Sequence, residues 1–200
     1  MRLTAMSAVT IAAGMTVQAG ETKRPQVTVY VRNSANVSGD VKAQAENQAS
    51  AMFASIGVKI DWRCGEPRST SEQALVIELA RNTPQNEKPG ALAYAKPYEG
   101  VHIVVFWDRM EFGLAPSSLL AHVMVHEITH ILEGVSRHSE SGIMKAHWEG
   151  DDYSHMDTKP LAFTRADIDL IYRGLDARAS HLAPSTLAAA NSAPEMVAAR

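Results

Sequence analysis

The order of hydrophobic patterns along the chain predicts an α/β (α+β) fold built around a single mixed sheet. Short β-branched runs alternate with longer segments whose apolar residues recur at helical spacing. We expect an N-terminal helix, a long central helix and a C-terminal helix. The 200 residues, 46% of them hydrophobic, suit one domain of ordinary size.

The first half of the chain supplies the strands of this sheet. Residues 26–31 read QVTVYV, an alternating β-branched run typical of a strand. Residues 39–56 carry apolar side chains at helical spacing, and Gly57 ends that pattern. Further strands are predicted at residues 58–62, 74–79, 91–95 and 101–107. The run at 91–95 consists of small residues, which predicts a weak, short strand at an exposed edge of the sheet.

The central helix is predicted over residues 114–133, where apolar residues form a wide stripe. Ser117 or Ser118 is available near its start as an N-cap. A long helix of this kind packs against the sheet and fixes the relative positions of its side chains.

The C-terminal region divides into a polar segment and a last helix. Residues 136–160 are rich in His, Gly, Asp and Ser, which predicts irregular structure. Helical spacing resumes over residues 164–179, and the separation of Thr164 and Asp167 suits a capping arrangement.

The two ends of the chain differ from the part between them. Residues 1–19 have a basic start, an uncharged apolar stretch and small residues at their end, which predicts a signal peptide. The apolar stretch at 3–17 is shorter than the roughly 20 residues that span a bilayer. We therefore expect no stable membrane insertion after cleavage, and a secreted or periplasmic domain over 20–179. An uncleaved anchor or an N-terminal helix is the alternative. The Ala, Ser and Pro content of 180–200 predicts a disordered tail.

Charge argues against nucleic acid as a partner. The net charge is -3, and Lys and Arg are scattered without a basic run. With Cys64 as its only cysteine, the chain can form no internal disulfide.

The residues that indicate chemistry are HEITH at 126–130. Residues four apart share a helix face, so His126 and His130 can direct their imidazoles at one metal ion. The carboxylate of Glu127 can reach a metal-bound water and act as general base. A catalytic zinc takes three protein ligands and leaves one position open, so a third ligand is needed.

Several residues downstream could be that third ligand. A glycine at a helix end adopts the left-handed conformation that reverses the chain, so Gly134 would return His138 toward the pair. The alternatives are His147, Glu149, Asp151 and Asp152. We expect His122, one turn before His126, to be a structural neighbour, because three ligands from one straight helix would splay along its axis.

HEITHILEGVSRHSESGIM, at 126–144, resembles the zinc-binding sequence of the metzincin metalloproteases. The resemblance implies a metzincin-like fold, with Gly134 as the turning glycine, His138 as the third ligand and Met144 in the tight Met-turn beneath the metal. It also implies that the edge strand at 91–95 pairs with an extended peptide substrate, with an ordinary short edge strand as the alternative. Three residues separate His130 from Gly134, and three separate Gly134 from His138, whereas the family pattern has two in each gap.

We therefore expect a secreted zinc metalloendopeptidase that binds one catalytic Zn²⁺ through His126, His130 and His138. Glu127 would be the general base, the substrate a protein or peptide, and the enzyme a monomer. One alternative is a zinc hydrolase acting on a non-peptide amide or ester. Another is a zinc-binding protein that has lost catalysis, although the intact Glu127 argues against it.

Residues 63–67, Arg-Cys-Gly-Glu-Pro, resemble the cysteine switch of matrix metalloproteinase propeptides, in which a thiolate caps the zinc. This stretch instead follows a predicted strand inside the domain. We expect it to be an ordinary turn, with an inhibitory role for Cys64 as the alternative.

Overall fold

One five-stranded sheet organises the computed structural model, which describes residues 24–68, 73–97, 99–110 and 115–182. The predicted signal peptide at 1–19 and nearly all of the predicted tail lie outside the described residues. The elements in chain order are β1 (Gln26–Arg32), α1 (Gly39–Ser55), β2 (Lys59–Cys64), β3 (Leu75–Ala80), β4 (Ala93–Ala95), β5 (His102–Phe106), a 3₁₀ turn (Trp107–Arg109), α2 (Pro116–Glu133), α3 (Gly150–His155) and α4 (Arg165–Leu182).

The sheet is mixed, as the sequence predicted. Its strand order is β2-β1-β3-β5-β4. The pairs among β2, β1, β3 and β5 are parallel, whereas β4 runs antiparallel to β5. The weak strand pattern at 91–95 thus corresponds to a short strand at one edge, and β2 forms the opposite edge.

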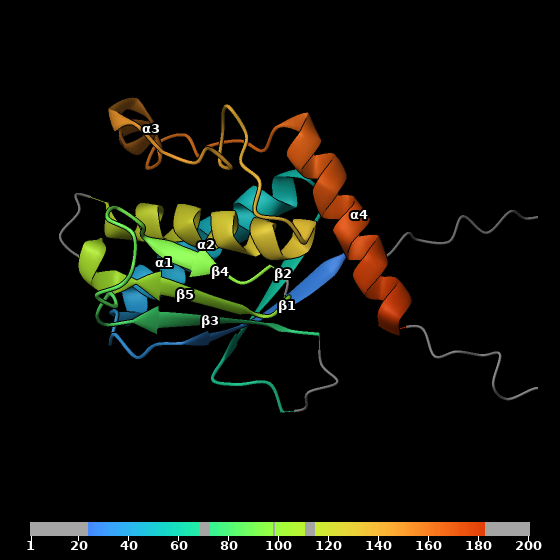
Figure 1. Cartoon of the computed structure of the whole chain (residues 1–200), viewed down its shortest axis with the longest axis horizontal. Helices are drawn as coiled ribbons and strands as arrows, with labels where there is room; N and C mark the ends of the chain where they lie inside the picture. The colour runs from blue at the N-terminus through green and yellow to red at the C-terminus, as the bar shows by residue number, and fades with distance from the viewer. Residues whose placement is uncertain (1–23, 69–72, 98, 111–114, 183–200) are drawn as a thin grey trace, which may run out of the picture.

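Helices α1 and α2 lie side by side on one face of this sheet (Figure 1). Alternate residues of β1 (Val27, Val29 and Val31) are buried and share one hydrophobic core with both helices. The middle of α2 is buried on all sides, because the sheet covers one side and residues 135–163 cover the other (Figure 1). This double burial explains the width of the apolar stripe in its sequence.

The segment above α2 contains a helix that the sequence did not predict. Residues 136–160 were expected to be irregular, but α3 occupies six of them. None of its residues is buried, so no apolar periodicity marks it. Its stability comes instead from a capping box between Glu149 and Asp152 and from acidic residues in its first turn.

The prediction that Ser117 or Ser118 caps the start of α2 was wrong. The helix begins at Pro116, and its N-cap residue Ala115 makes no side-chain capping bond. Proline suits the first turn because its missing N–H would have no partner there. Ser118 lies inside the helix, fully buried, and its hydroxyl donates to Asp157 Oδ1 at 2.8 Å.

Helix α4 begins as predicted and continues three residues beyond the expected end at 179. Its capping arrangement is confirmed: the Thr164 N–H donates to Asp167 Oδ2 at 2.7 Å, and the Asp167 N–H donates to Thr164 Oγ1 at 3.3 Å. The helix crosses the end of α2, where Gly174 lies against the Leu132 carbonyl. None of the helices in the described ranges has the length and apolarity needed to cross a bilayer.

Candidate metal centre

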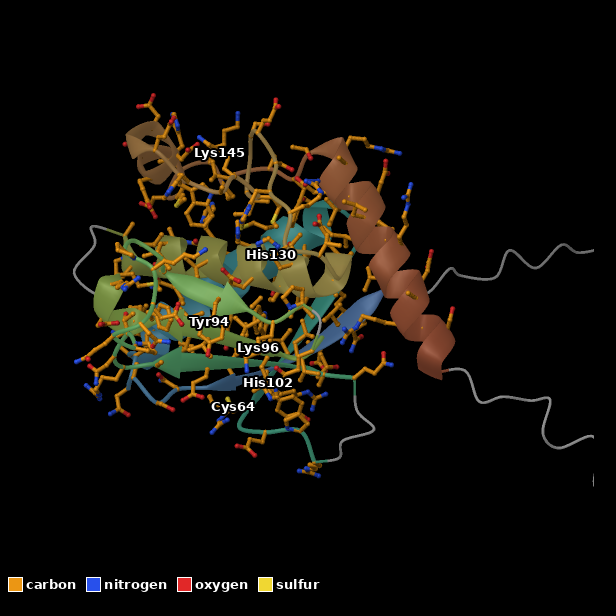
Figure 2. The ribbon with its side chains drawn as sticks, in the orientation of Figure 1. Cys64, Tyr94, Lys96, His102, His130 and Lys145 are labelled. Carbon is orange, nitrogen blue, oxygen red and sulfur yellow. The ribbon has the colours of Figure 1, made fainter. Side chains whose placement is uncertain are left out.

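The C-terminal half of α2 presents two imidazoles on one side. His126 and His130 lie one turn apart, and their Nε2 atoms are 3.0 Å from each other. Both residues are buried, with 9% and 6% of their surface exposed. Figure 2 shows His130 on the side of α2 that faces the segment carrying Lys145. The i, i+4 spacing thus produces the convergence that the sequence predicted.

Backbone carbonyls fix the protonation of both rings. His126 Nδ1 lies 2.9 Å from the Ile143 carbonyl oxygen, and His130 Nδ1 lies 3.2 Å from that of Val135. A carbonyl only accepts, so each Nδ1 carries the proton and each Nε2 holds a lone pair. Burial lowers the pKa of both imidazoles to about 4, which keeps them neutral. Two lone pairs 3.0 Å apart repel each other unless a cation lies between them, so this pair fits a metal.

Gly134 ends α2 and brings a third imidazole to the pair. It is left-handed, with φ 69° and ψ 15°, and its N–H donates to the His130 carbonyl at 3.0 Å. The His138 ring then lies 5.3 Å from the His126 ring and 5.0 Å from the His130 ring, measured between centroids. Nitrogen donors that share a tetrahedral zinc lie roughly 3.3 Å apart, and the donor atoms of these three histidines all lie within 4.8 Å of one another.

None of the alternative third ligands belongs to this group of donors. Among the described residues, these three histidines form the one group of His, Cys, Asp or Glu side chains close enough to hold a metal ion. Asp152 is bound by Lys145 Nζ at 2.6 Å and by the Glu149 N–H at 2.9 Å. The geometry therefore favours His138, whose role as a ligand remains a prediction.

Met144 lies in a tight turn next to the histidines. The Lys145 N–H donates to the Gly142 carbonyl at 3.3 Å, and Gly142 has φ 76°. The Met144 side chain is fully buried, and the preceding carbonyl, that of Ile143, is the one that orients His126. Its position fits the floor role implied by the resemblance, and that role remains a prediction.

Glu127 is a buried carboxyl beside the edge strand. It is 8% exposed and accepts a hydrogen bond from the Ala95 N–H in β4. Burial raises its pKa to about 8, and the Ala95 N–H opposes part of this shift. A carboxyl that titrates near neutral pH is suited to taking up and releasing a proton.

His122 is structural, as expected. It is fully buried; its Nδ1–H donates to the Ser118 carbonyl at 2.7 Å, and its Nε2 accepts from the Leu161 N–H at 3.1 Å. Burial lowers its pKa, so the ring is neutral. With both nitrogens engaged, it ties α2 to the segment above it.

A cleft of about 330 Å³ opens beside the histidines. Residues 88–93 form one wall and residues 145–148 form part of the other, while His126, Glu127 and His138 line the space between them. The Trp148 ring stands edge-on to His126, 5.6 Å between centroids. Sequence reasoning missed Trp148, because a lone aromatic residue in a polar segment carries no periodic signal.

The outer edge of β4 faces this cleft. On its inner edge, the Leu92 carbonyl accepts from Phe106 N–H at 2.8 Å, and Lys96 N–H donates to the His102 carbonyl at 3.1 Å. Successive residues of a strand direct their backbone groups to opposite edges, so Ala93 and Ala95 direct theirs outward. Ala95 uses its N–H on Glu127, and Ala93 lines the cleft.

Cys64 lies far from the histidines. It is the last residue of β2, at the sheet edge opposite β4, and it is exposed and free. Figure 2 shows it across the sheet from His130. This placement argues against zinc capping by its thiol within the chain.

Comparisons with known proteins bear on the fold. No family model matches the chain, and no curated protein matches it. Among solved structures, it resembles the crystal structure of archaemetzincin from Methanopyrus kandleri, with a TM-score of 0.51 and 15% sequence identity over 80% of this chain and 99% of that one. At this identity the likeness establishes the fold alone, which is a metzincin-like α/β fold, as the resemblance implied.

Proposed function

We propose that this chain is a zinc metalloendopeptidase. The observation that carries the proposal is the meeting of three imidazoles and one buried carboxyl at a single cleft, beside an open strand edge. His126, His130 and His138 would hold the zinc, and Glu127 would be the general base.

The donor set fits a catalytic rather than a structural zinc. Three histidine nitrogens suit zinc and leave a fourth position open, whereas structural sites usually close all four. When bound, zinc would lower the pKa of a water molecule and polarise the carbonyl of a substrate.

Glu127 supplies the proton transfers. It takes a proton from the attacking water and later delivers it to the leaving amine. The Ala95 N–H holds the Glu127 carboxylate at the edge of β4, so the general base lies beside the edge that would bind the substrate. His126 and His130 keep their rings oriented through their Nδ1 bonds to backbone carbonyls.

The strand edge favours a peptide over a non-peptide amide or ester. The outward N–H and C=O of Ala93 can pair with an extended main chain, as in β-strand addition. A small ester has no repeating backbone to match that edge. The aromatic wall at Trp148 would then contact a substrate side chain next to the scissile bond.

Metal analysis and peptide cleavage test the proposal together. The purified chain should hold close to one zinc, and a peptide library should be cut, with cleavage stopped by a chelator and restored by zinc. His130→Ala should lose stoichiometric zinc. Zinc binding with hydrolysis of simple esters alone would favour the non-peptide hydrolase, and zinc binding without any hydrolysis would favour the lapsed enzyme.

The third ligand needs its own test. His138→Ala should weaken zinc affinity far more than His147→Ala, which changes an exposed histidine of the same cleft. Equal effects of the two variants would remove His138 from the ligand set.

We also propose that the chain is exported and acts as a monomer. The export proposal rests on the signal-like composition of residues 1–19. N-terminal sequencing of the protein recovered outside the cytoplasm should begin near residue 20, and sedimentation of that form should give the mass of one chain. An intact N-terminus on protein retained inside the cell would contradict export.

A further inference from the structure

We propose that Asp167, in the first turn of α4, is a positioning residue that sets the place of His138. The inference rests on the proposed function, in which His138 is a zinc ligand. Asp167 Oδ1 accepts from Arg137 Nη2 at 2.7 Å and from Ser139 Oγ at 2.5 Å. One carboxylate oxygen therefore holds the residues on both sides of His138.

The anchor is rigid. Asp167 is fully buried, and its other oxygen, Oδ2, accepts from the Thr164 N–H at 2.7 Å, which fixes it to the start of α4. When a buried carboxylate loses one of its charge-assisted hydrogen bonds, the folded protein is strongly destabilised. The Asp167 side chain therefore resists displacement. The loop is thus attached to a helix end rather than to another loop.

His138 depends on this anchor more than the other two histidines do. The rings of His126 and His130 are each oriented by an Nδ1 bond to a carbonyl, on a buried helix. His138 is exposed on a loop, and its ring makes no hydrogen bond to any other described residue. Its position is therefore set by its backbone, which the Arg137 and Ser139 contacts fix.

The same stretch of chain also supports the turn at Met144. The Ile143 N–H donates to the Ala162 carbonyl at 3.0 Å, and the Ser139 N–H donates to the Met144 carbonyl at 2.7 Å. The loop that carries His138 and the turn beneath the histidines are thus braced together from residues 162–167. A loop with three residues in each gap around Gly134 has more conformational freedom than a shorter one. The hydrogen bonds from Arg137 and Ser139 to Asp167, which we call the clamp, remove that freedom.

Zinc affinity of the purified chain, measured by chelator competition, is the test. Loss of a partner outside the ligand set typically weakens metal binding about 10–100-fold, and we expect a change of that size for Asp167→Asn. In cobalt-loaded protein, the visible absorption band should weaken or shift as His138 leaves the metal. Neither readout requires hydrolysis.

Two control variants separate positioning from stability. Asp169→Asn makes the same chemical change two residues away, on an exposed carboxylate paired with Arg165 at 3.2 Å, and should leave zinc affinity unchanged. Thr164→Ala removes one capping bond of α4 and none of the hydrogen bonds from Asp167 to Arg137 and Ser139, so it should lower thermal stability without a matching loss of zinc affinity.

A double variant covers the case in which Asp167→Asn is poorly folded. Ser139→Ala deletes a single contact of the clamp, and its effect on zinc affinity should disappear in a His138→Ala background, because the ligand it positions is gone. Wild-type zinc affinity and cobalt spectrum in both folded Asp167→Asn and Ser139→Ala would overturn the inference, as would equal losses in the two backgrounds. If the wild-type chain bound no zinc, the proposed function itself would fail.

Discussion

The buried histidines of α2 owe their ring orientations to carbonyls contributed by later residues. Ile143 lies 17 residues after His126, yet its carbonyl determines which nitrogen of that imidazole is free to bind a metal. The sequence could predict that His126 and His130 share a face, because helical spacing is local. It could not predict the tautomer, which depends on the path of the chain after Gly134.

Glu127 offers the sharpest test of mechanism at the scale of one residue. Glu127→Gln should keep zinc and fold while slowing peptide hydrolysis about 10²–10⁴-fold, since base catalysis and metal binding are separate roles. The measurement is kcat beside zinc content. Glu140→Gln, an exposed glutamate of the neighbouring loop, is the matched control and should behave as wild type. Near-wild-type cleavage by Glu127→Gln would exclude it as the base.

Glu133 should make the stability of the metal-free protein depend on pH. Its side chain is fully buried, and neither carboxyl oxygen has a hydrogen-bond partner among the described residues. Burial raises its pKa to about 7; Arg137, 3.8 Å away, lowers it, and Asp167 of α4 raises it further. The folded state thus holds a proton that the unfolded state, with an ordinary pKa of 4.5, has lost, so this contribution to stability declines as pH rises from about 4.5 through 7.

Glu133→Gln removes that ionisation. We expect the variant to match wild type at pH 5 and to exceed it at pH 8 by an amount on the order of 1–3 kcal/mol. Denaturant unfolding of chelator-treated protein at the two pH values would measure the difference. A stability difference that is the same at pH 5 and pH 8 would mean that Glu133 titrates normally.

At the scale of elements, the sequence predicted what local periodicity encodes. β-branched runs predicted four of the strands, the run of small residues at 91–95 predicted the fifth, and apolar spacing predicted α1, α2 and α4 within a few residues. The six-residue helix α3 was missed because it buries none of its side chains. The cap of α2 was misplaced because Ser118 bonds Asp157 from a segment 39 residues away.

The same distinction applies to the candidate site. The HEITH pattern and Gly134 are local features. The structure brings His126, His130 and His138 together, as these features predicted. The clamp is not local: Asp167 lies about 30 residues from Arg137 and Ser139, and its spacing to Thr164 predicted a helix cap but not its second set of partners. Trp148 likewise reaches His126 only through the fold of the segment above α2.

At Gly174, where α4 crosses α2, helix propensity and packing predict opposite effects of an alanine substitution. Alanine is a better helix former than glycine by about 0.5–1 kcal/mol, which alone would make Gly174→Ala stabilising. A Cβ at Gly174 would overlap the carbonyl oxygen of Leu132, however, and the backbone of α2 cannot easily move away from it. We expect Gly174→Ala to lose about 1–3 kcal/mol, as overpacked sites do, when measured by urea unfolding.

Gly39→Ala is the control for that experiment. Gly39 opens α1, and a Cβ there would meet no atom within 4 Å. It should be neutral or slightly stabilising. If both variants gained stability, the close approach of α4 to α2 at Gly174 would be disproved.

At the scale of the whole molecule, the candidate centre joins three parts of the fold. The histidine pair belongs to α2, Glu127 contacts the sheet edge at β4, and His138 lies on the segment that is held by α4. Strand β4 and the start of α4 each lie more than 30 residues from the histidine pair in sequence. A metal bound to the three histidines would therefore connect the end of α2 to the segment above it, in addition to any role in catalysis.

Zinc should consequently stabilise the fold as a whole. A ligand that binds only the folded state adds RT ln(1 + [L]/Kd), which is about 4 kcal/mol when free zinc is 1,000 times its Kd. Thermal unfolding should shift to higher temperature with zinc and return with a chelator. Glu127→Gln should show the full shift because it keeps every ligand, whereas His130→Ala should show little. A ligand that binds the folded state tightly must raise the melting temperature. Equal melting temperatures for wild type with stoichiometric zinc and with excess chelator would therefore mean that zinc does not bind the folded domain tightly.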